Sequence, residues 1–437
     1  MEWMSNYRSK ITTAEAAVDV IKSGDHVYIH PGCAVPETLI RAMVARGEEL
    51  SDVKVDHILT IGEAGYVSED MQGHFRHNAL FIGGNVRKAV AEGLADSTHI
   101  YLHEVAKLFY DKILPVDVAL IHVSPPDEHG FCSFGVGVEM TKPACEMAKI
   151  IVAQVNPRMP RVLGDCFIHI SKIDVVVEVD EPIREMPQVG EISDAKEQEV
   201  YDKIGGHIAD LIEDESTMQM GIGAIPDAVL NYLENKRDLG VHTEMFSDGV
   251  IKLVEMGVVN NEKKSLHKGK MVASFVLGTR TIFDFIDNNP VVEFHPSHYV
   301  NNPFIVAQNK KQVAINSALQ VDITGQVCAD SIGPRLYSGF GGQVDFIRGA
   351  AHSEGGKPII ALPSTARGGE LSRIVPHLIP GAGVTTNRAD VHYVVTEYGV
   401  ASLFGKTVRQ RVNELIHIAH PKFRDELRAY AREVKYI

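Results

Sequence analysis

A carboxylate that its apolar neighbours predict to be half-buried is the feature of this sequence best suited to chemistry. Glu244 stands in the run 241–249, where the apolar Met245 and Phe246 follow it and an Asp-Gly turn closes the segment. A solitary glutamate is usually a solvated surface residue, but apolar neighbours on a short strand-like run favour partial burial. Because an ionised carboxylate can act as a covalent nucleophile, Glu244 is our candidate catalytic residue.

A glycine-rich turn precedes this glutamate by one predicted helix and one predicted strand. It comprises Gln219, Met220, Gly221, Ile222 and Gly223 and runs into a helix with a proline near its start. Glycines let a ligand approach the backbone closely, and the free N–H groups of a helix start favour an anion. The turn lacks the third glycine of a dinucleotide fingerprint and the Gly-Lys-Ser/Thr of a P-loop, so nicotinamide and nucleoside triphosphate ligands are poorly supported. A tight turn without any ligand is the alternative.

A second glycine-rich run has the composition of an oxyanion hole. Gly339, Gly341 and Gly342 fall within four residues, directly before a predicted helix. Backbone N–H groups in such a run can point at a developing negative charge with no side chain in the way. The alternative is a mobile loop without a chemical role.

A polar loop, Asn-Asn-Pro at 301–303, follows an apolar strand-like run that ends in a cluster with two histidines. His295 and His298 are three residues apart on no clear helix. That arrangement does not match a metal-ligand pattern, and we therefore predict no metal site.

The chain contains a repeat of about 190 residues, which is the size of a domain. Pro36 and Pro226 each open a predicted helix after a strand-like run, and the motif Asp-x-x-Gly begins at both Asp127 and Asp322. At the position that corresponds to Glu244, the first repeat has a lysine. Loss of a carboxylate from one copy is the pattern expected if only the second copy is catalytic.

Strand-like and helical segments alternate along both repeats. Continuous β-branched runs are typical of strands buried on both faces, and alternation with helices favours mostly parallel sheets covered by helices. We therefore predict an α/β fold with two homologous open α/β domains, at residues 1–190 and 191–437, linked through the polar stretch 188–199. Strands are expected at 116–123, 150–155, 175–179, 313–318, 359–362 and 391–396, and the main helices of the second half at 194–214, 407–419 and 421–434.

Composition narrows the class of protein. The 437 residues are 45% hydrophobic and 23% charged, which is enough apolar material for two or three domain cores. Five cysteines without a C-x-x-C pair favour buried, reduced thiols. A net charge of −14 argues against nucleic-acid binding, although local donors could still hold a phosphorylated small ligand. With no signal-peptide pattern and no apolar run of about eighteen residues, we expect a cytoplasmic protein that does not bind membranes.

Taken together, these motifs resemble the acetyl-CoA hydrolase/transferase family, with the greatest similarity to its 4-hydroxybutyrate and butyryl-CoA:acetate CoA-transferases. Four ordered motifs at compatible spacing are specific to the family, although not to one acid. They are Thr-Glu-Met-Phe-Ser-Asp-Gly at 243–249, Gln-Met-Gly-Ile-Gly-Ala-Ile-Pro at 219–226, Asn-Asn-Pro at 301–303 and Gly-Phe-Gly-Gly-Gln-Val-Asp-Phe at 339–346. The resemblance extends from His-Pro-Gly at 30–32 to Ile-Ala-His-Pro at 418–421.

This resemblance implies catalytic roles for several residues. Glu244 matches the glutamate that becomes a glutamyl-CoA thioester, and Gly342 matches a backbone oxyanion donor, with the Gly341 amide beside it. Asn301 matches an amide that helps to hold the reacting carbonyl. Glu397 is similar to an active-site carboxylate of the family.

Coenzyme A is implied as a substrate, with no permanently bound cofactor. The loop 219–223 matches the segment that receives coenzyme A, and Leu319 falls in a segment that lines the same arm of the ligand. Gly342 also belongs to this ligand site, and Lys406, at a predicted helix start, is a candidate contact for a CoA phosphate. The family also implies a homodimer or a dimer of dimers.

The implied reaction is a ping-pong exchange of coenzyme A between acetyl-CoA and a short-chain carboxylate, with 4-hydroxybutyrate as our expected acceptor. A glutamate with an ordinary pKa near 4.3 is ionised at neutral pH and can attack a thioester without a general base. Three alternatives remain open. They are acetyl-CoA hydrolysis at the same glutamate, butyryl-CoA:acetate transfer, and a non-catalytic regulator that binds a phosphorylated metabolite.

Overall fold

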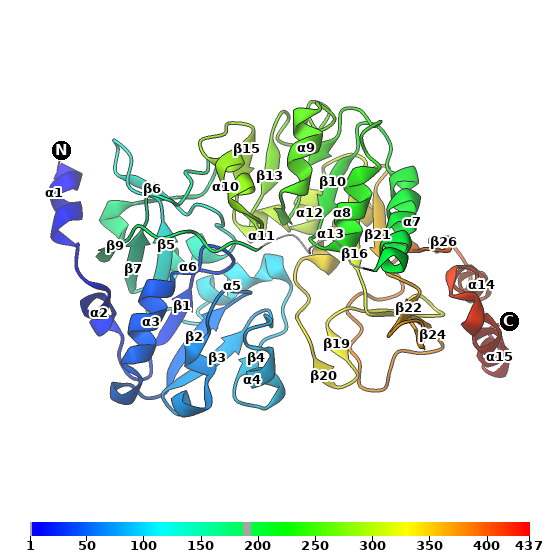
Figure 1. Ribbon diagram of the computed structural model, residues 1–437, viewed down its shortest axis with the longest axis horizontal. Coiled ribbons are helices and arrows are strands. Elements are labelled where there is room, and N and C mark those ends of the chain that lie inside the picture. Colours follow the sequence, from blue (N-terminus) through cyan, green and yellow to red (C-terminus); the bar gives the residue numbers. More distant parts are fainter. Residues whose placement is uncertain (1, 187–193) are drawn as a thin grey trace. The chain divides into compact units, whose positions relative to one another are not determined.

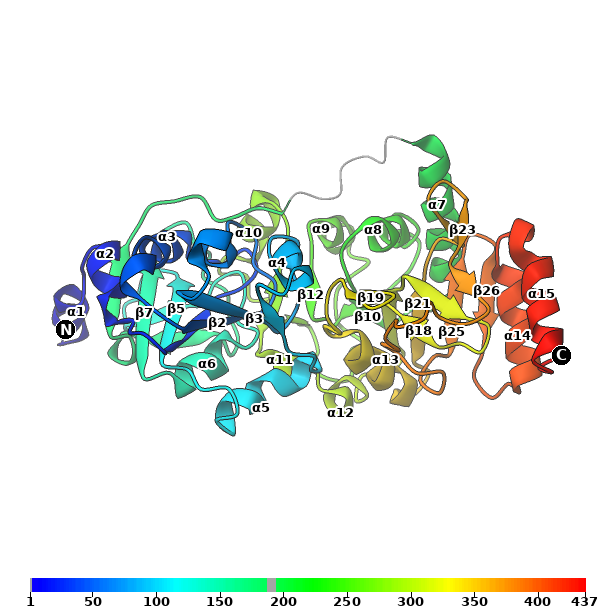
Figure 2. The same cartoon turned by 90° about the horizontal axis from the view of Figure 1, so that it is seen from below.

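The computed structural model describes residues 2–186 and 194–437, and the chain divides into two compact units. The N-terminal unit contains the residues up to 186 together with 272–300, and the C-terminal unit contains the remaining described residues. Each unit is built around a largely parallel sheet with helices beside it (Figures 1 and 2), which confirms the predicted α/β class. Within the part of the chain that is described, no helix is both long and apolar enough to cross a membrane.

The sheet of the N-terminal unit has seven parallel strands in the order β4-β3-β2-β1-β5-β7-β9. Every residue of the central strand β5 (Val118–Val123) is buried, as its continuous apolar run predicts. Helix α3 (Glu37–Ala45) turns Leu39 and Met43 into the core beside this sheet. The other strands are β1 (His26–Ile29), β2 (Val53–His57), β3 (Phe75–Ala79), β4 (Asp96–Ser97), β7 (Ile150–Val155) and β9 (Val175–Glu178).

The sheet of the C-terminal unit has six strands in the order β11-β10-β16-β21-β25-β26. The first five are parallel, and β26 runs antiparallel to β25. Helix α13 (Gln343–His352) packs on β16 and β21 (Figure 1). The strands are β10 (Thr217–Met220), β11 (Gly240–Val241), β16 (Gln312–Ser317), β21 (Lys357–Ala361), β25 (Tyr393–Thr396) and β26 (Gly399–Ser402).

The helices predicted for the second half are present. Asp194 caps α7 (Ala195–Leu211), where its carboxylate accepts a hydrogen bond from the backbone N–H of Lys196. A capping box between Thr407 and Gln410 opens α14 (Val408–Ile418). Helix α15 (Arg424–Glu433) lies beside α14 near the C-terminus (Figure 2).

The internal repeat is visible in the connectivity of the two units. In the first, β1 leads through α3 to its parallel neighbour β2, and β5 pairs with the other side of β1. In the second, β10 leads through α8 (Ala224–Asn231) to β11, and β16 pairs with the other side of β10.

Local turn chemistry repeats as well. Asp127 and Asp322 each accept hydrogen bonds from the backbone N–H groups two and four residues later. Gly130 and Gly325 close these turns with φ of +86° and +96°, a conformation that favours glycine. The two copies of the Asp-x-x-Gly motif therefore have the same structure.

One segment departs from the predicted division at residues 190 and 191. Residues 272–300 belong to the N-terminal unit, although they follow Glu244 in sequence. Backbone hydrogen bonds join Val138 to Ser274, and Gly164 bridges to Phe294. Two uninterrupted domains, 1–190 and 191–437, are therefore not what the packing shows. Of the predicted linker 188–199, residues 188–193 lie outside the described residues and the rest opens α7.

All five cysteines of the sequence are buried and free of disulfide bonds. Burial raises the pKa of the Cys33, Cys132 and Cys166 thiols to about 12. These thiols are protonated at neutral pH, so they are not candidates for the reactive nucleophile.

Candidate active site

Glu244 lies just beyond the carboxyl end of β11, at the edge of the sheet in the C-terminal unit. On the outer side of β11, two side chains hydrogen-bond to the backbone of Val241. The N–H of Val241 donates to Asn261 Oδ1 at 2.9 Å, and Lys264 Nζ donates to the Val241 carbonyl at 2.7 Å. On the inner side, the hydroxyl of Thr243 donates to the carbonyl of Met220, the last residue of β10, at 3.1 Å. The backbone that carries Glu244 is therefore fixed from both sides.

Two donors converge on the Glu244 carboxylate. Asn301 Nδ2 donates to Glu244 Oε2 at 2.8 Å, and Asn301 itself is fully buried. The backbone N–H of Gly342 is the other hydrogen-bond partner of the carboxylate. A Cβ atom built on Gly342 would lie 1.9 Å from Glu244 Oε2 and 2.3 Å from Asn301 Nδ2, so this position has room only for glycine.

Helix packing brings these donors together. Asn302 caps α12 (Pro303–Val306) through a hydrogen bond from the Phe304 N–H to Asn302 Oδ1 at 3.0 Å. Helix α12 packs against α13, with Gly349 of α13 directly against Val306. Since Asn301 precedes α12 and Gly342 precedes α13, the contact between these helices places both donors at Glu244.

The pKa of Glu244 is raised to about 7. Burial is the main cause, and the negative charge of Asp345 on α13 adds to it, while the hydrogen bonds from Asn301 and Gly342 act in the opposite direction. The ordinary pKa near 4.3 assumed from the sequence is therefore wrong for this residue. A carboxylate of higher pKa is a stronger base and a poorer leaving group than the carboxylate of a simple fatty acid.

This raised pKa predicts how the rate depends on pH. Below pH 7 Glu244 becomes protonated and cannot attack, so kcat/KM for acetyl-CoA should fall about tenfold per pH unit on the acid side and level off above pH 7. The measurement is kcat/KM for the exchange of labelled acetate into acetyl-CoA, from pH 5 to 8.5 at constant ionic strength, because acetate stays mostly ionised above pH 5. An acid limb centred near pH 4.5 would contradict the electrostatic description of Glu244.

The glycine-rich turn lies at the carboxyl end of β10. Gln219 and Met220 are buried in the strand, where Gln219 Oε1 accepts a hydrogen bond from Asn316 Nδ2 at 3.0 Å. Gly221 and Gly223 border open space, because no atom lies within 4 Å of a Cβ built on either, and Gly223 has φ +109°. Ile222 between them is 36% exposed. The turn thus offers backbone and one apolar side chain to a ligand, in the crevice where α/β sheets bind ligands.

Leu319 and Glu397 lie at other points of the same unit, whereas Gly341 directly precedes Gly342. Leu319 is half-buried between β16 and β17 (Gln320–Asp322), and its N–H donates to the Cys328 carbonyl at 2.8 Å. Gly341 has φ +54° next to Gly342. Glu397 follows β25, which β16 and β21 separate from β10, and its carboxylate accepts hydrogen bonds from the N–H and hydroxyl of Ser364.

Lys406 is half-buried and forms an ion pair with Glu414, at 2.6 Å between Nζ and Oε1. Glu414 lies on α14. The lysine therefore already has a carboxylate partner within its own segment, which weakens its candidacy as a contact for a CoA phosphate.

Sequence reasoning missed several residues that shape the site. Asn261 and Lys264 are far from β11 in sequence and carry no motif that would have shown their contact with Val241. Gln343 and Asp345 stand inside the glycine-rich motif, where their position beside Gly342 was a usable signal.

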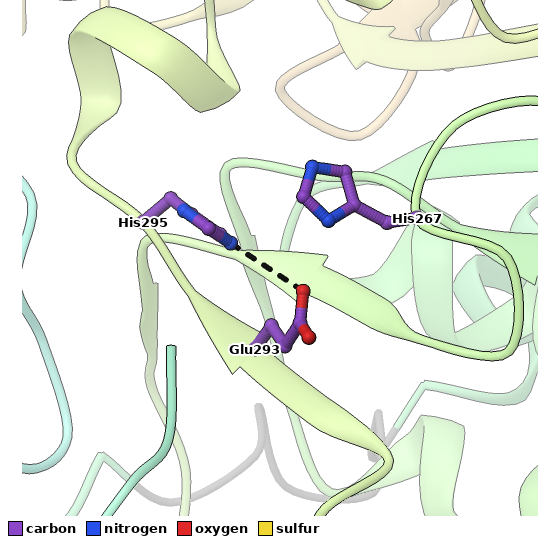
Figure 3. Close-up of side chains that lie close together, drawn as sticks. All are labelled: His267, Glu293 and His295. Atoms are coloured by element: carbon purple, nitrogen blue, oxygen red, sulfur yellow. Dashed lines mark ion pairs between the residues drawn. The ribbon is translucent and has the colours of Figure 1, made fainter. Parts of the chain in front are cut away.

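The histidine cluster noted in the sequence includes one ion pair. The carboxylate of Glu293 and the imidazole of His295 are 3.5 Å apart, and both side chains are half-buried. Figure 3 shows this pair, which belongs to the N-terminal unit. His267, also drawn there, comes from the C-terminal unit. Within the N-terminal unit the pair supplies fewer ligands than the three or four of a typical protein zinc site, so we assign no metal to it.

The fold is an α/β architecture with a buried carboxylate held by two donors, and comparison with known proteins identifies the family. The N-terminal domain model of the acetyl-CoA hydrolase/transferase family matches residues 1–187, and the C-terminal domain model matches residues 278–431. The chain therefore belongs to the acetyl-CoA hydrolase/transferase family. Glu244 lies between the matched ranges, so the evidence for its role is the geometry described above.

Its relatives include named CoA-transferases. The chain is 53% identical to a 4-hydroxybutyrate coenzyme A transferase of Clostridium kluyveri, over 98% of both chains. It is 52% identical to a succinyl-CoA:acetate/propanoyl-CoA:succinate CoA transferase of Fasciola hepatica, over 98% of this chain and 87% of the relative. The crystal structure of a 4-hydroxybutyrate CoA-transferase from Porphyromonas gingivalis superposes with a TM-score of 0.85 at 41% identity, over 99% of this chain and all of that one.

Proposed function

We propose that this protein transfers coenzyme A between an acyl-CoA and a short-chain carboxylate, through a glutamyl-CoA thioester formed on Glu244. The observation that carries the proposal is the convergence of Asn301 Nδ2 and the Gly342 N–H on one carboxylate of raised pKa. A structural ion pair would place a cation beside such a carboxylate. Here two neutral donors meet it, which is the arrangement that stabilises an oxyanion on the same atom.

The chemistry follows from this arrangement. The Glu244 carboxylate attacks the thioester carbonyl, the C–S bond breaks, and a mixed anhydride and CoA thiolate result. The thiolate then attacks the glutamyl carbonyl, where Asn301 and Gly342 stabilise the oxyanion, and the first carboxylate leaves. Because Glu244 is the poorer leaving group of the two acids in the anhydride, this direction of breakdown is favoured over reversal. An incoming carboxylate repeats the steps in reverse order and leaves as the new acyl-CoA.

Coenzyme A is proposed as a substrate that enters at the glycine-rich turn 219–223, with Leu319 along its path. The open space over Gly221 and Gly223 supports this placement, since a ligand can reach the backbone there. Glu397 and Lys406 remain proposed ligand contacts, and for Lys406 the ion pair with Glu414 would have to rearrange. We propose no permanently bound cofactor, and a homo-oligomer as the assembly.

The acceptor is proposed to be 4-hydroxybutyrate, on the strength of the 53% identical relative that carries this name. Other relatives are named for succinate, propanoyl or butyryl substrates. One methylene changes transition-state binding by only about 1–3 kcal/mol in an apolar pocket, so we expect a preference among short acids with side activity toward neighbours.

Steady-state kinetics test this function. With acetyl-CoA as donor and butyrate, 4-hydroxybutyrate or succinate as acceptor, a transferase should give parallel double-reciprocal lines and no thioester loss without acceptor. Acceptor-independent release of free CoA at a comparable rate would instead identify a hydrolase, in which water reaches the intermediate. Binding of acyl-CoA without either reaction would support the regulator alternative.

A further inference from the structure

Gln343 occupies a position that neither the proposed chemistry nor the motif explains. It is the first residue of α13 and directly follows Gly342, yet the residue is only 9% exposed. Both ends of its amide are used. Its Nε2 donates to the Ser317 carbonyl at 2.7 Å, and its Oε1 accepts from the Thr386 hydroxyl at 3.0 Å.

The two anchors of this amide belong to fixed parts of the unit. Ser317 is the last residue of the central strand β16. Thr386 is fully buried and exchanges backbone hydrogen bonds with Val327, in both directions at 3.0–3.2 Å. Gln343 therefore connects the start of α13 to strand β16 through one hydrogen bond. Through the other it connects α13 to Thr386, whose backbone pairs with Val327.

The segment before Gln343 needs such an anchor. Residues 338–342 include three glycines, and Gly341 adopts φ +54°, so local preferences do little to fix this loop. An oxyanion donor works only when it is held about 2.7–3.1 Å from the place where the oxyanion forms. The Gly342 carbonyl accepts a hydrogen bond from the Phe346 N–H at 3.0 Å, and the position of the Gly342 N–H depends further on what holds Gln343, the next residue.

We propose that Gln343 is a positioning residue that holds the Gly342 N–H at the reaction centre and links it to the segment 317–319. Leu319 is two residues beyond the Ser317 carbonyl that Gln343 binds. A ligand arm that packs on Leu319 therefore acts on the segment 317–319. The hydrogen bond between Gln343 and the Ser317 carbonyl passes this effect to the neighbouring Gly342 N–H. Binding energy from a part of coenzyme A remote from the thioester can in this way lower the barrier of the chemical step. This inference rests on the proposed function.

Two variants separate this role from simple packing. Gln343→Met keeps the side-chain volume and removes both hydrogen bonds of the Gln343 amide. Thr386→Val removes only the bond that the Thr386 hydroxyl donates to Gln343. For Gln343→Met we expect kcat to fall roughly 10- to 100-fold, less than for loss of the donor itself, with KM for acetyl-CoA within about threefold of wild type. Thr386→Val should show the same pattern with a smaller fall, and Thr386→Ser, which keeps the hydroxyl, should recover most of the wild-type kcat.

A packing defect would not shift the pH dependence of kcat/KM, so this dependence distinguishes the positioning role from simple packing. The Gly342 hydrogen bond lowers the pKa of Glu244, so a displaced donor should shift the acid limb of kcat/KM to higher pH in Gln343→Met. Gln198→Met on α7 serves as the matched control, because its amide bonds to Asp202 within the same helix. It should leave kcat and the acid limb unchanged.

Several outcomes would overturn the positioning role. One is an unshifted acid limb together with a fall in kcat that matches the loss of folded protein in thermal unfolding. Another is a rise in KM with kcat unchanged. If Gln343→Met does not fold, Thr386→Val and Thr386→Ser decide the question by the same criteria. If the wild-type protein forms no glutamyl adduct, the proposed function is rejected. If Gln343→Met forms a normal adduct at the wild-type rate, only the positioning role is rejected.

Discussion

Replacing Glu244 with glutamine should lower kcat for CoA transfer by roughly 10⁴-fold or more, as expected for removal of a covalent nucleophile. Glutamine has nearly the same shape and can still accept the hydrogen bond from Asn301 Nδ2, so the site should keep its geometry. An uncharged amide, however, cannot attack a thioester to form an anhydride. Exchange of labelled acetate into acetyl-CoA measures the loss, and calorimetric titration with CoA should give an affinity close to that of the wild type.

A matched control guards against a general effect of charge. Glu255 is an exposed residue at the end of α9 (Gly249–Glu255), and Glu255→Gln should leave kcat unchanged. Activity of Glu244→Gln within tenfold of wild type would place the nucleophile elsewhere. A regulator would behave differently again, because it would bind the ligand equally well in both forms and catalyse exchange in neither.

The second large effect is expected for Gly342→Ala, with kcat lower by roughly 10²- to 10³-fold, or about 2.7–4 kcal/mol of transition-state stabilisation. The added Cβ would lie 1.9 Å from Glu244 Oε2, so the donor loop and the carboxylate cannot keep their present positions. Gly342 has φ −95°, which alanine adopts readily. The loss would therefore come from displaced donors and not from a strained backbone.

Gly206→Ala is the control for this substitution. Gly206 lies within α7, and no atom lies within 4 Å of a Cβ built on it, so alanine should leave kcat unchanged and stabilise the helix by up to about 1 kcal/mol. Steady-state assays and thermal unfolding of both variants measure the two effects. Wild-type kcat in a folded Gly342→Ala enzyme would show that the oxyanion donor has been assigned to the wrong residue.

The fold could be predicted from sequence where local constraints repeat. The Asp-x-x-Gly turns at Asp127 and Asp322 need a particular side chain and a glycine at fixed spacing, and so they marked the repeat in the sequence. Continuous β-branched runs such as β5 were equally informative, because a strand covered on both faces has apolar residues throughout. Glu244 and Gly342 were predicted as site residues from similar features of local composition, and the structure brings them within contact of each other.

Tertiary packing explains what the sequence did not predict. Residues 272–300 join the N-terminal unit through contacts more than a hundred residues away in sequence, and nothing in their own pattern indicates this. Likewise, the pKa of Glu244 depends on burial and on Asp345, a residue 101 positions later. The contact of Lys264 with the strand before Glu244 has the same origin. Such properties appear only once the chain has folded.

The central claim is a covalent glutamyl-CoA thioester on Glu244, and mass spectrometry tests it most directly. The protein is mixed with acetyl-CoA without acceptor, and its intact mass is measured before and after borohydride reduction, followed by peptide mapping. We predict a CoA adduct that borohydride removes, with the reduced product on the peptide that contains Glu244 and no adduct in Glu244→Gln. An adduct on another peptide, or rapid exchange with no adduct at all, would contradict this account.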